Sequence, residues 1–306
     1  MWLRWMVLPA RFVFVLLSVV TLIFFIQRMI PGTPADAVLG PDAALVQKMK
    51  WMHDNGLDLP LSDQYVAYLK RLLQGDLGTK IVDGKPIAPI LRERLSATFK
   101  LAGSAFLFSL VFAFASGVLG AMRPGSRTDN LLALASLVLV SAPVFITGTL
   151  LLWIFSVNLN LFPLTGNGGV KALFLPSVTL GAALAATTGR MMRAMLLDVM
   201  SENYIRTARA KGVGFAGLYF KHALRNAVLP VLAILGLQLA GLLGGTVITE
   251  QVFTWPGLGS LMIEAVNQRD YNLVSACVIV LATIHVLVAW LVELLQRIVD
   301  PRTEIR

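Results

Sequence analysis

The chain has 306 residues, of which 57% are hydrophobic and 14% are charged, and its mean hydropathy is +0.74. Soluble domains carry about 25% charged residues, so this composition excludes an ordinary soluble domain and indicates a membrane protein. The net charge of +9 does not indicate nucleic-acid binding, because most basic residues flank apolar runs instead of clustering on a soluble face. A single cysteine, Cys277, excludes a disulfide framework.

Six apolar segments are each long enough to cross a bilayer core, which takes about 20 residues at about 1.5 Å per residue. The sequence therefore predicts an all-α polytopic membrane protein. We expect a kink in the third segment, because it contains Pro143. The segments are Arg11–Gln27, Leu101–Met122, Leu131–Val157, Ala172–Met192, Ala227–Ile248 and Leu273–Leu295.

The first segment, within residues 1–30, has a second interpretation as a cleaved signal peptide. Arg4 and Arg11 precede its apolar stretch, and Ala35 and Ala37 have the A-x-A spacing of a cleavage site. Two polar residues and two prolines separate the apolar stretch from that site, which favours a retained span.

Residues 31–97 form a long loop after the first span. The stretch "SDQYVAYLKRLL" places Tyr65, Leu69 and Leu72 at helical spacing. This pattern, together with the loop's mixture of acids and bases, predicts a small extracytoplasmic cap. The remaining spans form a core over residues 98–300, followed by a tail of residues 301–306.

The orientation follows from the distribution of Lys and Arg. The positive-inside rule does not count loops longer than about 60 residues, so the first outer loop is left out. The segments on the side of the termini then hold 14 Lys and Arg, against 2 on the opposite side. Both termini are predicted to be cytoplasmic.

The spans contain almost no ionisable side chains between their ends. His285 is the exception, and we interpret it as a helix-packing residue. Carriers coupled to protons or ions usually need intramembrane acids or histidines, so energy for uphill transport would enter from outside the membrane. Small residues at helix-packing spacing occur in the second span and in the fifth span, and they predict that each of these spans packs closely on other helices of a bundle. These residues are Ala113, Gly117 and Ala121 in the second span and Gly241 and Gly245 in the fifth.

A basic, glycine-interrupted segment lies between the fourth and fifth spans, from Glu202 to Pro230. Ser201 can cap a helix there, with Glu202 at its positive end and Lys211 at its negative end. Gly212 is suited to a left-handed stop. Tyr204, Thr207, Ala208 and Lys211 would share one face of this rod of about 15 Å, and Pro230 would mark the start of the fifth span.

This segment has two other interpretations. Gly212, Gly214 and Gly217 form G-x-G-x-x-G, but the dinucleotide fingerprint needs a preceding strand and a later acid, and position 232 is leucine. A positive loop that merely contacts anionic lipid headgroups stays open on the residues alone, although it leaves the capped helix unexplained.

The motifs "NYIRTARAKG" and "KHALRNAVLP" resemble the cytoplasmic signature of binding-protein-dependent ABC importer permeases in the peptide/nickel branch, which includes the dipeptide and oligopeptide permeases. Further blocks along nearly the whole chain look like the same family, namely "RMIPGTPA", "QGDLGTK", "GRMMRAMLLDVMS" and "TEQVFTWPGLGSLMIEAVNQRDYN". The general signature opens with Glu and two alanines, whereas this chain has Arg206, Thr207 and Ala208, as is usual in the peptide branch. Thr33 and Lys80 replace residues that are more often Asp and Ser.

The resemblance implies a multi-pass subunit of the bacterial inner membrane that is not itself an enzyme. Its protein partners would be a homologous second permease, two ATP-binding subunits and an extracytoplasmic substrate-binding protein. It would also contact membrane lipid, and it would bind no nucleic acid. ATP and Mg would be used by the ATP-binding subunits, and this chain would bind no cofactor. It contains no phosphate-binding loop, zinc-ligand spacing or catalytic motif of its own.

The family's coupling helix would correspond to residues 202–212, and it would transmit closure of the ATP-binding subunits to the fourth and fifth spans. A bulky residue at Ala208 or Gly212 is expected to uncouple ATP hydrolysis from uptake. The residues expected at this contact are Glu202, Tyr204, Arg206, Thr207, Ala208, Arg209, Lys211 and Gly212.

The turn around Trp255, Pro256, Gly257 and Gly259 is expected either to face the binding protein or to use its Trp as an interfacial anchor. Dipeptides and oligopeptides are the expected substrates, with glutathione or nickel chelates as alternatives. A stand-alone channel is the rival class, but the spans show little of the charge that lines channels.

Overall fold

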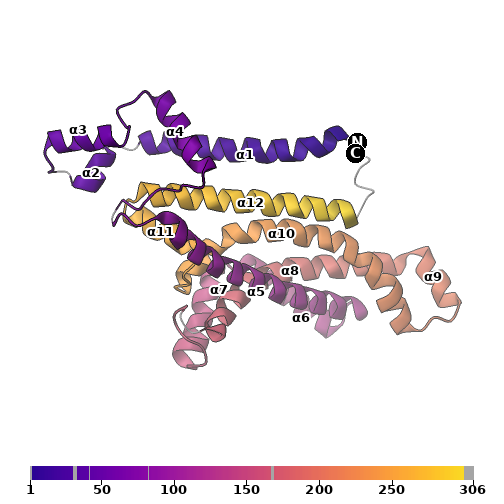
Figure 1. Ribbon diagram of the computed structural model, residues 1–306. Helices are drawn as coiled ribbons and strands as arrows, with labels where there is room; N and C mark the ends of the chain where they lie inside the picture. Colours follow the sequence, from indigo (N-terminus) through magenta and orange to yellow (C-terminus); the bar gives the residue numbers. More distant parts are fainter. Residues whose placement is uncertain (1, 30–32, 41, 82, 167–168, 300–306) are drawn as a thin grey trace. The chain divides into compact units, whose positions relative to one another are not determined.

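The computed structural model describes residues 2–29, 33–40, 42–81, 83–166 and 169–299. Nearly all of their regular structure is helical, and the only β pairing in these ranges is one bridge between Thr79 and Pro86 (Figure 1). In chain order the helices, with the π-helices labelled η, are α1 (Trp2–Met29), α2 (Pro34–Leu39), α3 (Leu45–Asp54), α4 (Leu61–Leu73), α5 (Ile87–Met122), α6 (Arg127–Ser141), α7 (Val144–Leu151), η1 (Leu152–Asn158), α8 (Val170–Ser201), α9 (Asn203–Ala210), η2 (Gly217–Ala223), α10 (Leu224–Val252), α11 (Leu258–Asn267) and α12 (Tyr271–Val299).

The prediction of an all-α polytopic membrane protein is confirmed. Among the described residues, five helices are long and apolar enough to cross a membrane, and α6 with α7–η1 would supply a sixth crossing. The helices are longer than the apolar segments that signalled them. For example, α5 begins at Ile87, fourteen residues before the predicted start at Leu101.

The kink expected at Pro143 is confirmed as a complete break. The α6 and α7–η1 segments meet at an angle of 107°. Ala142 is extended, with φ −78° and ψ 126°, as the steric restriction on a residue before proline favours. Pro143 itself caps α7, so the third apolar segment is two helices and not one bent rod.

The chain forms two compact units. The first comprises the residues up to Ala97 together with Gly257–Val286. The second comprises Thr98–Pro256 together with the residues from Leu287 onward. Helices α5 and α12 contribute to both units.

In the first unit, α4 packs on the C-terminal half of α1. The fully buried ring of Phe24 lies 5.1 Å from the ring of Tyr65 and 5.5 Å from that of Tyr68. Arg28 Nη2 donates to Gln64 Oε1 at 2.8 Å. The helix predicted from the spacing of Tyr65, Leu69 and Leu72 is thus confirmed, and its aromatic face holds the cap against the first span.

In the second unit, α8 is the central helix, and α5, α6, α7 and α10 pack against it. Glycines allow the closest approaches. A methyl group at Gly117 of α5 would lie 2.6 Å from Met192 Cβ and 2.8 Å from the carbonyl oxygen of Gly189, both on α8. The predicted packing role of Gly117 is confirmed, whereas no atom of the described residues lies within 4 Å of a Cβ added at Gly241. The surroundings of Gly245 lie outside the described residues.

Two acidic side chains, Asp129 and Glu250, are buried in the described part of the second unit, and the position of Glu250 differs from the expectation from sequence. The sequence placed Glu250 in the loop after the fifth span, but α10 continues to Val252 and Glu250 is fully buried. The Thr98 hydroxyl donates to Glu250 Oε1 at 2.7 Å. Pro230, expected at the start of the fifth span, lies within α10, because helical backbone already begins upstream of Leu224.

The packing of α5 on α8 yields a prediction. Gly117→Ala should destabilise the protein by about 1–3 kcal/mol, because the added methyl overlaps Met192 and the backbone of Gly189. Gly103→Ala is the matched control on the same helix, since nothing lies within 4 Å of its added Cβ. Thermal unfolding in detergent should show a lower Tm for Gly117→Ala alone. Equal Tm values for the two variants would contradict this packing.

Candidate functional site

The short helix α9 lies between the two long helices α8 and α10 (Figure 1). Its eight residues begin after Glu202, which is extended with φ −67° and ψ 148°. The expectation that Ser201 caps α9 is wrong. Ser201 is the last residue of α8, and its hydroxyl donates back to the carbonyl oxygen of Asp198 at 2.7 Å. Glu202 occupies the N-cap without a side-chain hydrogen bond to the helix.

The C-terminal end of α9 is a Schellman turn. The Gly212 N–H donates to the carbonyl oxygen of Arg209 at 3.0 Å, and the Val213 N–H donates to that of Ala208 at 3.2 Å. Gly212 has φ +82°, so the left-handed stop predicted from its position is confirmed. Val213 and Ala208 pack on the same apolar cluster, which adds the apolar contact typical of this motif.

The underside of α9 is fixed by one apolar side chain. Ile205 is fully buried, in a cluster with Met192 and Leu196 of α8 and Leu218 and Tyr219 of η2. The face predicted from sequence did not include Ile205. The available signal was that Ile205 is the only large aliphatic residue in an otherwise polar helix, which is typical of an inward anchor.

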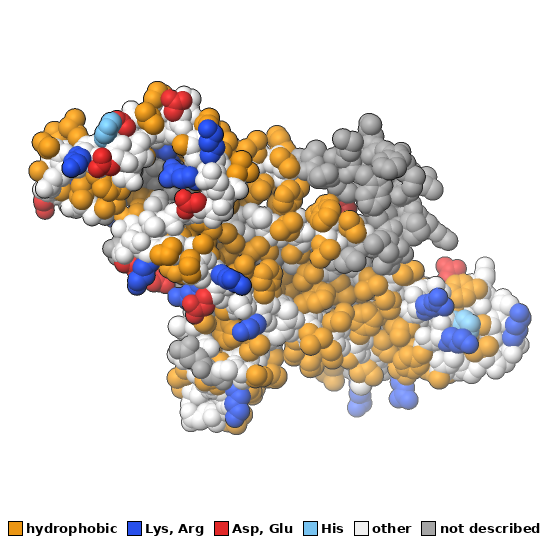
Figure 2. All heavy atoms as spheres, in the orientation of Figure 1, with side chains coloured by type: hydrophobic (Ala, Val, Ile, Leu, Met, Phe, Trp, Pro, Cys, Tyr) orange, Lys and Arg blue, Asp and Glu red, His pale blue; other side chains and the backbone are white. Residues whose placement is uncertain are grey.

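The opposite side of α9 is exposed and basic. Figure 2 shows Lys and Arg side chains over the end of the second unit that carries α9. Tyr204 is 42% exposed, and its hydroxyl accepts a hydrogen bond from Asn226 Nδ2 at 2.8 Å. Ala208 is partly buried against the cluster that contains Ile205. It therefore lies on the inner side of α9 and does not face outward. The other exposed members of the predicted set are Glu202, Arg206, Thr207, Arg209, Lys211 and Gly212.

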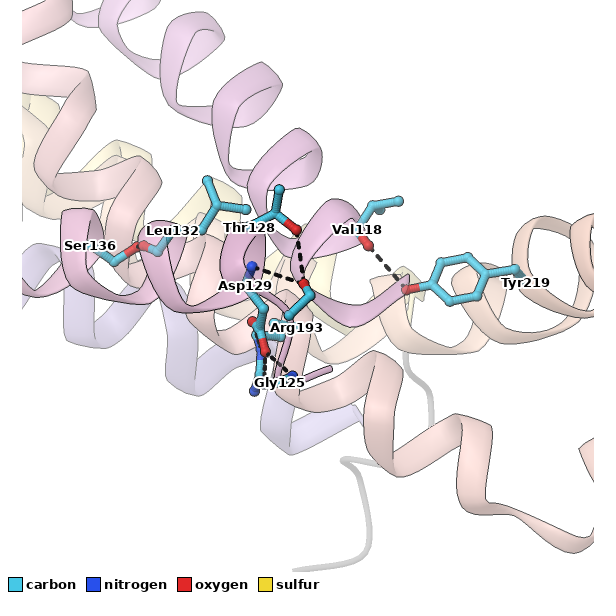
Figure 3. Close-up of polar contacts among 9 residues, drawn as sticks. Val118, Gly125, Thr128, Asp129, Leu132, Ser136, Arg193 and Tyr219 are labelled. Atoms are coloured by element: carbon cyan, nitrogen blue, oxygen red, sulfur yellow. Dashed lines mark hydrogen bonds and ion pairs between the residues drawn. The ribbon is translucent and has the colours of Figure 1, made fainter. Parts of the chain in front are cut away.

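Both stems of α9 are tied to neighbouring helices by polar contacts (Figure 3). On α8, Arg193 Nε and Nη2 donate to the two carboxylate oxygens of Asp129 at 2.6 and 2.7 Å. On η2, the Tyr219 hydroxyl donates to the carbonyl oxygen of Val118 at 3.2 Å. Neither contact follows from local sequence, because each joins residues more than 60 positions apart.

Residues 109–305 match the family model described as "Binding-protein-dependent transport system inner membrane component". The chain belongs to this family. It is therefore an inner-membrane permease of the ABC importer class, of the peptide/nickel type.

Relatives of known name support the same assignment. The permease is 37% identical to the glutathione transport system permease protein GsiC of Escherichia coli strain K12, over 288 residues and 94% of each chain. It is 39% identical, with the same coverage, to the protein of that name from Pectobacterium atrosepticum. A chain in a crystal structure of an amino acid ABC transporter with histidines shares the fold, with a TM-score of 0.55 at 16% identity over 69% of this chain and 94% of that chain.

The turn predicted to face the binding protein is largely internal. The Trp255 side chain is 7% exposed, and Gly257 and Gly259 are also buried. A buried ring does not fit the interfacial-anchor interpretation, which places the ring among headgroups. A methyl group at Gly166 would lie 2.9 Å from Pro256 Cδ. The loop between η1 and α8, which contains Gly166, therefore packs tightly against this turn. Contact with a binding protein stays a prediction.

The interpretation of His285 as a packing residue finds no support among the described residues of this chain, and packing against another subunit stays a prediction. Its side chain is exposed on α12. Gly212 and Gly214 lie between α9 and η2, Gly217 is the first residue of η2, and a helix instead of a strand precedes them, so the structural context of a dinucleotide fingerprint is missing.

The Schellman turn yields a second prediction. Gly212→Ala should destabilise the end of α9 by about 1–2 kcal/mol, because a β-carbon is strained at φ +82°. Amide exchange at Val213, whose N–H is bonded to Ala208, should become faster. Gly214→Ala is the control, since its added Cβ meets nothing within 4 Å and its backbone is not left-handed. Unchanged exchange at Val213 in Gly212→Ala would refute the assignment of the stop.

Proposed function

We propose that this permease imports short peptides, glutathione among them, and that an ATP-binding subunit docks on α9. The substrate proposal is supported by the relatives, which are named glutathione transport system permease proteins. Glutathione is itself a tripeptide, so it falls within the class of short peptides expected from the family branch. The nickel-chelate alternative has no comparable support from these relatives.

The observation that carries the docking proposal is the contrast between the two faces of α9. The buried Ile205 and the two stems hold the helix in place, while Arg206 and Arg209 project from it without being buried. A helix whose buried side is fixed to the protein and whose exposed side is charged can transmit force from a protein partner. An acidic groove is the complementary surface, because opposite charges across an interface favour association and register.

The orientation proposed from the positive-inside rule places α9 in the cytoplasm, where ATP is available. Closure of two ATP-binding subunits would then displace α9 and, through it, α8 and α10. The pathway would shift from inward-facing to outward-facing because the partner contacts one state better than the other. A homologous second permease and an extracytoplasmic binding protein complete the proposed importer, and ATP and Mg belong to the ATP-binding subunits.

Charge reversal on the exposed face tests the docking proposal. The double variant Arg206→Glu with Arg209→Glu should lower ATP-dependent uptake about tenfold or more, because like charges across an interface cost several kcal/mol. Co-purification of the ATP-binding subunit should fall in parallel. The double variant Lys50→Glu with Lys70→Glu, at exposed positions of α3 and α4, makes the same change in net charge and is the control. This design avoids Ala208, where a bulky residue would disturb the cluster below α9. Normal uptake in the double variant would exclude docking on this face.

Direct uptake measurements test the substrate. In a strain that lacks its own glutathione and peptide importers, the permease with its partner subunits should take up radiolabelled glutathione or dipeptides. A nickel chelate should be taken up at background level. The ATP-binding subunit without ATPase activity gives the zero control. Uptake of the nickel chelate alone would overturn the peptide assignment and leave the importer assignment intact.

A further inference from the structure

The α5–α6 hairpin, residues 118–136, contacts both stems of α9 (Figure 3). One contact is to α8, which leads into α9, and the other is to η2, which follows α9. The hairpin is thus joined to the chain on each side of the docking helix.

The first contact is an ion pair whose carboxylate is buried. The Asp129 side chain is 3% exposed. Beside the two bonds from Arg193, its Oδ2 accepts the Gly125 N–H at 2.9 Å. A two-pronged guanidinium–carboxylate contact fixes orientation as well as distance. Arg193 therefore sets the angle between α8 and the N-terminal end of α6.

The second contact involves Tyr219, which is 1% exposed and among the largest fully buried side chains in the described residues. Its hydroxyl bonds to Val118 of α5, and its ring stacks on Phe215 with the ring centroids 5.6 Å apart. The ring also belongs to the cluster that holds Ile205. Tyr219 thus joins the base of α9 to the end of α5.

We propose that the α5–α6 hairpin moves together with α9 as one body, and that Asp129, Arg193 and Tyr219 are positioning residues for coupling. This inference rests on the proposed docking of an ATP-binding subunit on α9. When α9 is displaced, the Asp129–Arg193 pair and the Tyr219 hydroxyl carry the displacement into α6 and α5. Without them, α8 can bend or slide against the hairpin, and ATP is hydrolysed without a matching movement of the second and third spans.

The test is the number of substrate molecules imported per ATP hydrolysed, measured on the complete importer in proteoliposomes. Asp129→Asn, Arg193→Gln and Tyr219→Phe should each lower this ratio, with about a fivefold or larger loss for the two ion-pair variants, the scale of a coupling between sites. Arg190→Gln, an exposed arginine one turn earlier on α8, should leave the ratio unchanged. Exchanging the partners, as Asp129→Arg with Arg193→Asp, should recover part of the ratio.

A purely structural role predicts a different pattern. The amount of assembled importer would then fall, while each assembled complex kept its normal ratio of import to hydrolysis. That result in all three variants would overturn the inference. Failure of the proposed function is distinguishable, because the charge reversals at Arg206 and Arg209 would then leave uptake unaffected. If those reversals abolish uptake while the Asp129 and Arg193 variants keep the normal ratio, only the inference about the hairpin is lost.

Discussion

The backbones of α5 and α8 lie so close that no side chain fits between them at Gly117, Gly181 and Gly189. In lipid, apolar helices gain little from leaving their surroundings, so their association depends on dispersion contacts and interhelical hydrogen bonds. Because α8 is also the stem of α9, this contact decides where the docking helix lies. The burial of Ile205 and the reach of Arg193 to Asp129 both require α8 in this position.

The parts of the permease that depend on local chemistry could be predicted from the sequence. Apolar length predicted the spans, the proline at position 143 predicted a kink where the helix proved to break, and the glycine at position 212 predicted the end of α9. The contacts that brace the site could not be found in this way. The partners of Arg193 and Tyr219 lie 64 and 101 positions away, and no periodic pattern indicates which distant residue a side chain will meet.

The errors have a common physical origin. Hydropathy locates the apolar part of a helix, but hydrogen bonding continues the helix beyond it, which is why Glu250 proved to be helical and buried. Of the face assigned to α9, Tyr204, Thr207 and Lys211 are exposed, and only Ala208 packs on the cluster of the chain itself. Spacing alone does not say which side of a short polar helix meets the core, and the single aliphatic residue, Ile205, decides it.

The break between α6 and α7 has a consequence for the assembled permease. A bilayer offers no water to the amide and carbonyl groups of non-helical backbone, so such backbone persists at membrane depth only where protein or an aqueous passage shields it. In the isolated chain Ser141 and Pro143 are exposed. If the bend lies at membrane depth, we expect a neighbouring subunit or an aqueous passage to shield this strip of surface from lipid in the assembled importer.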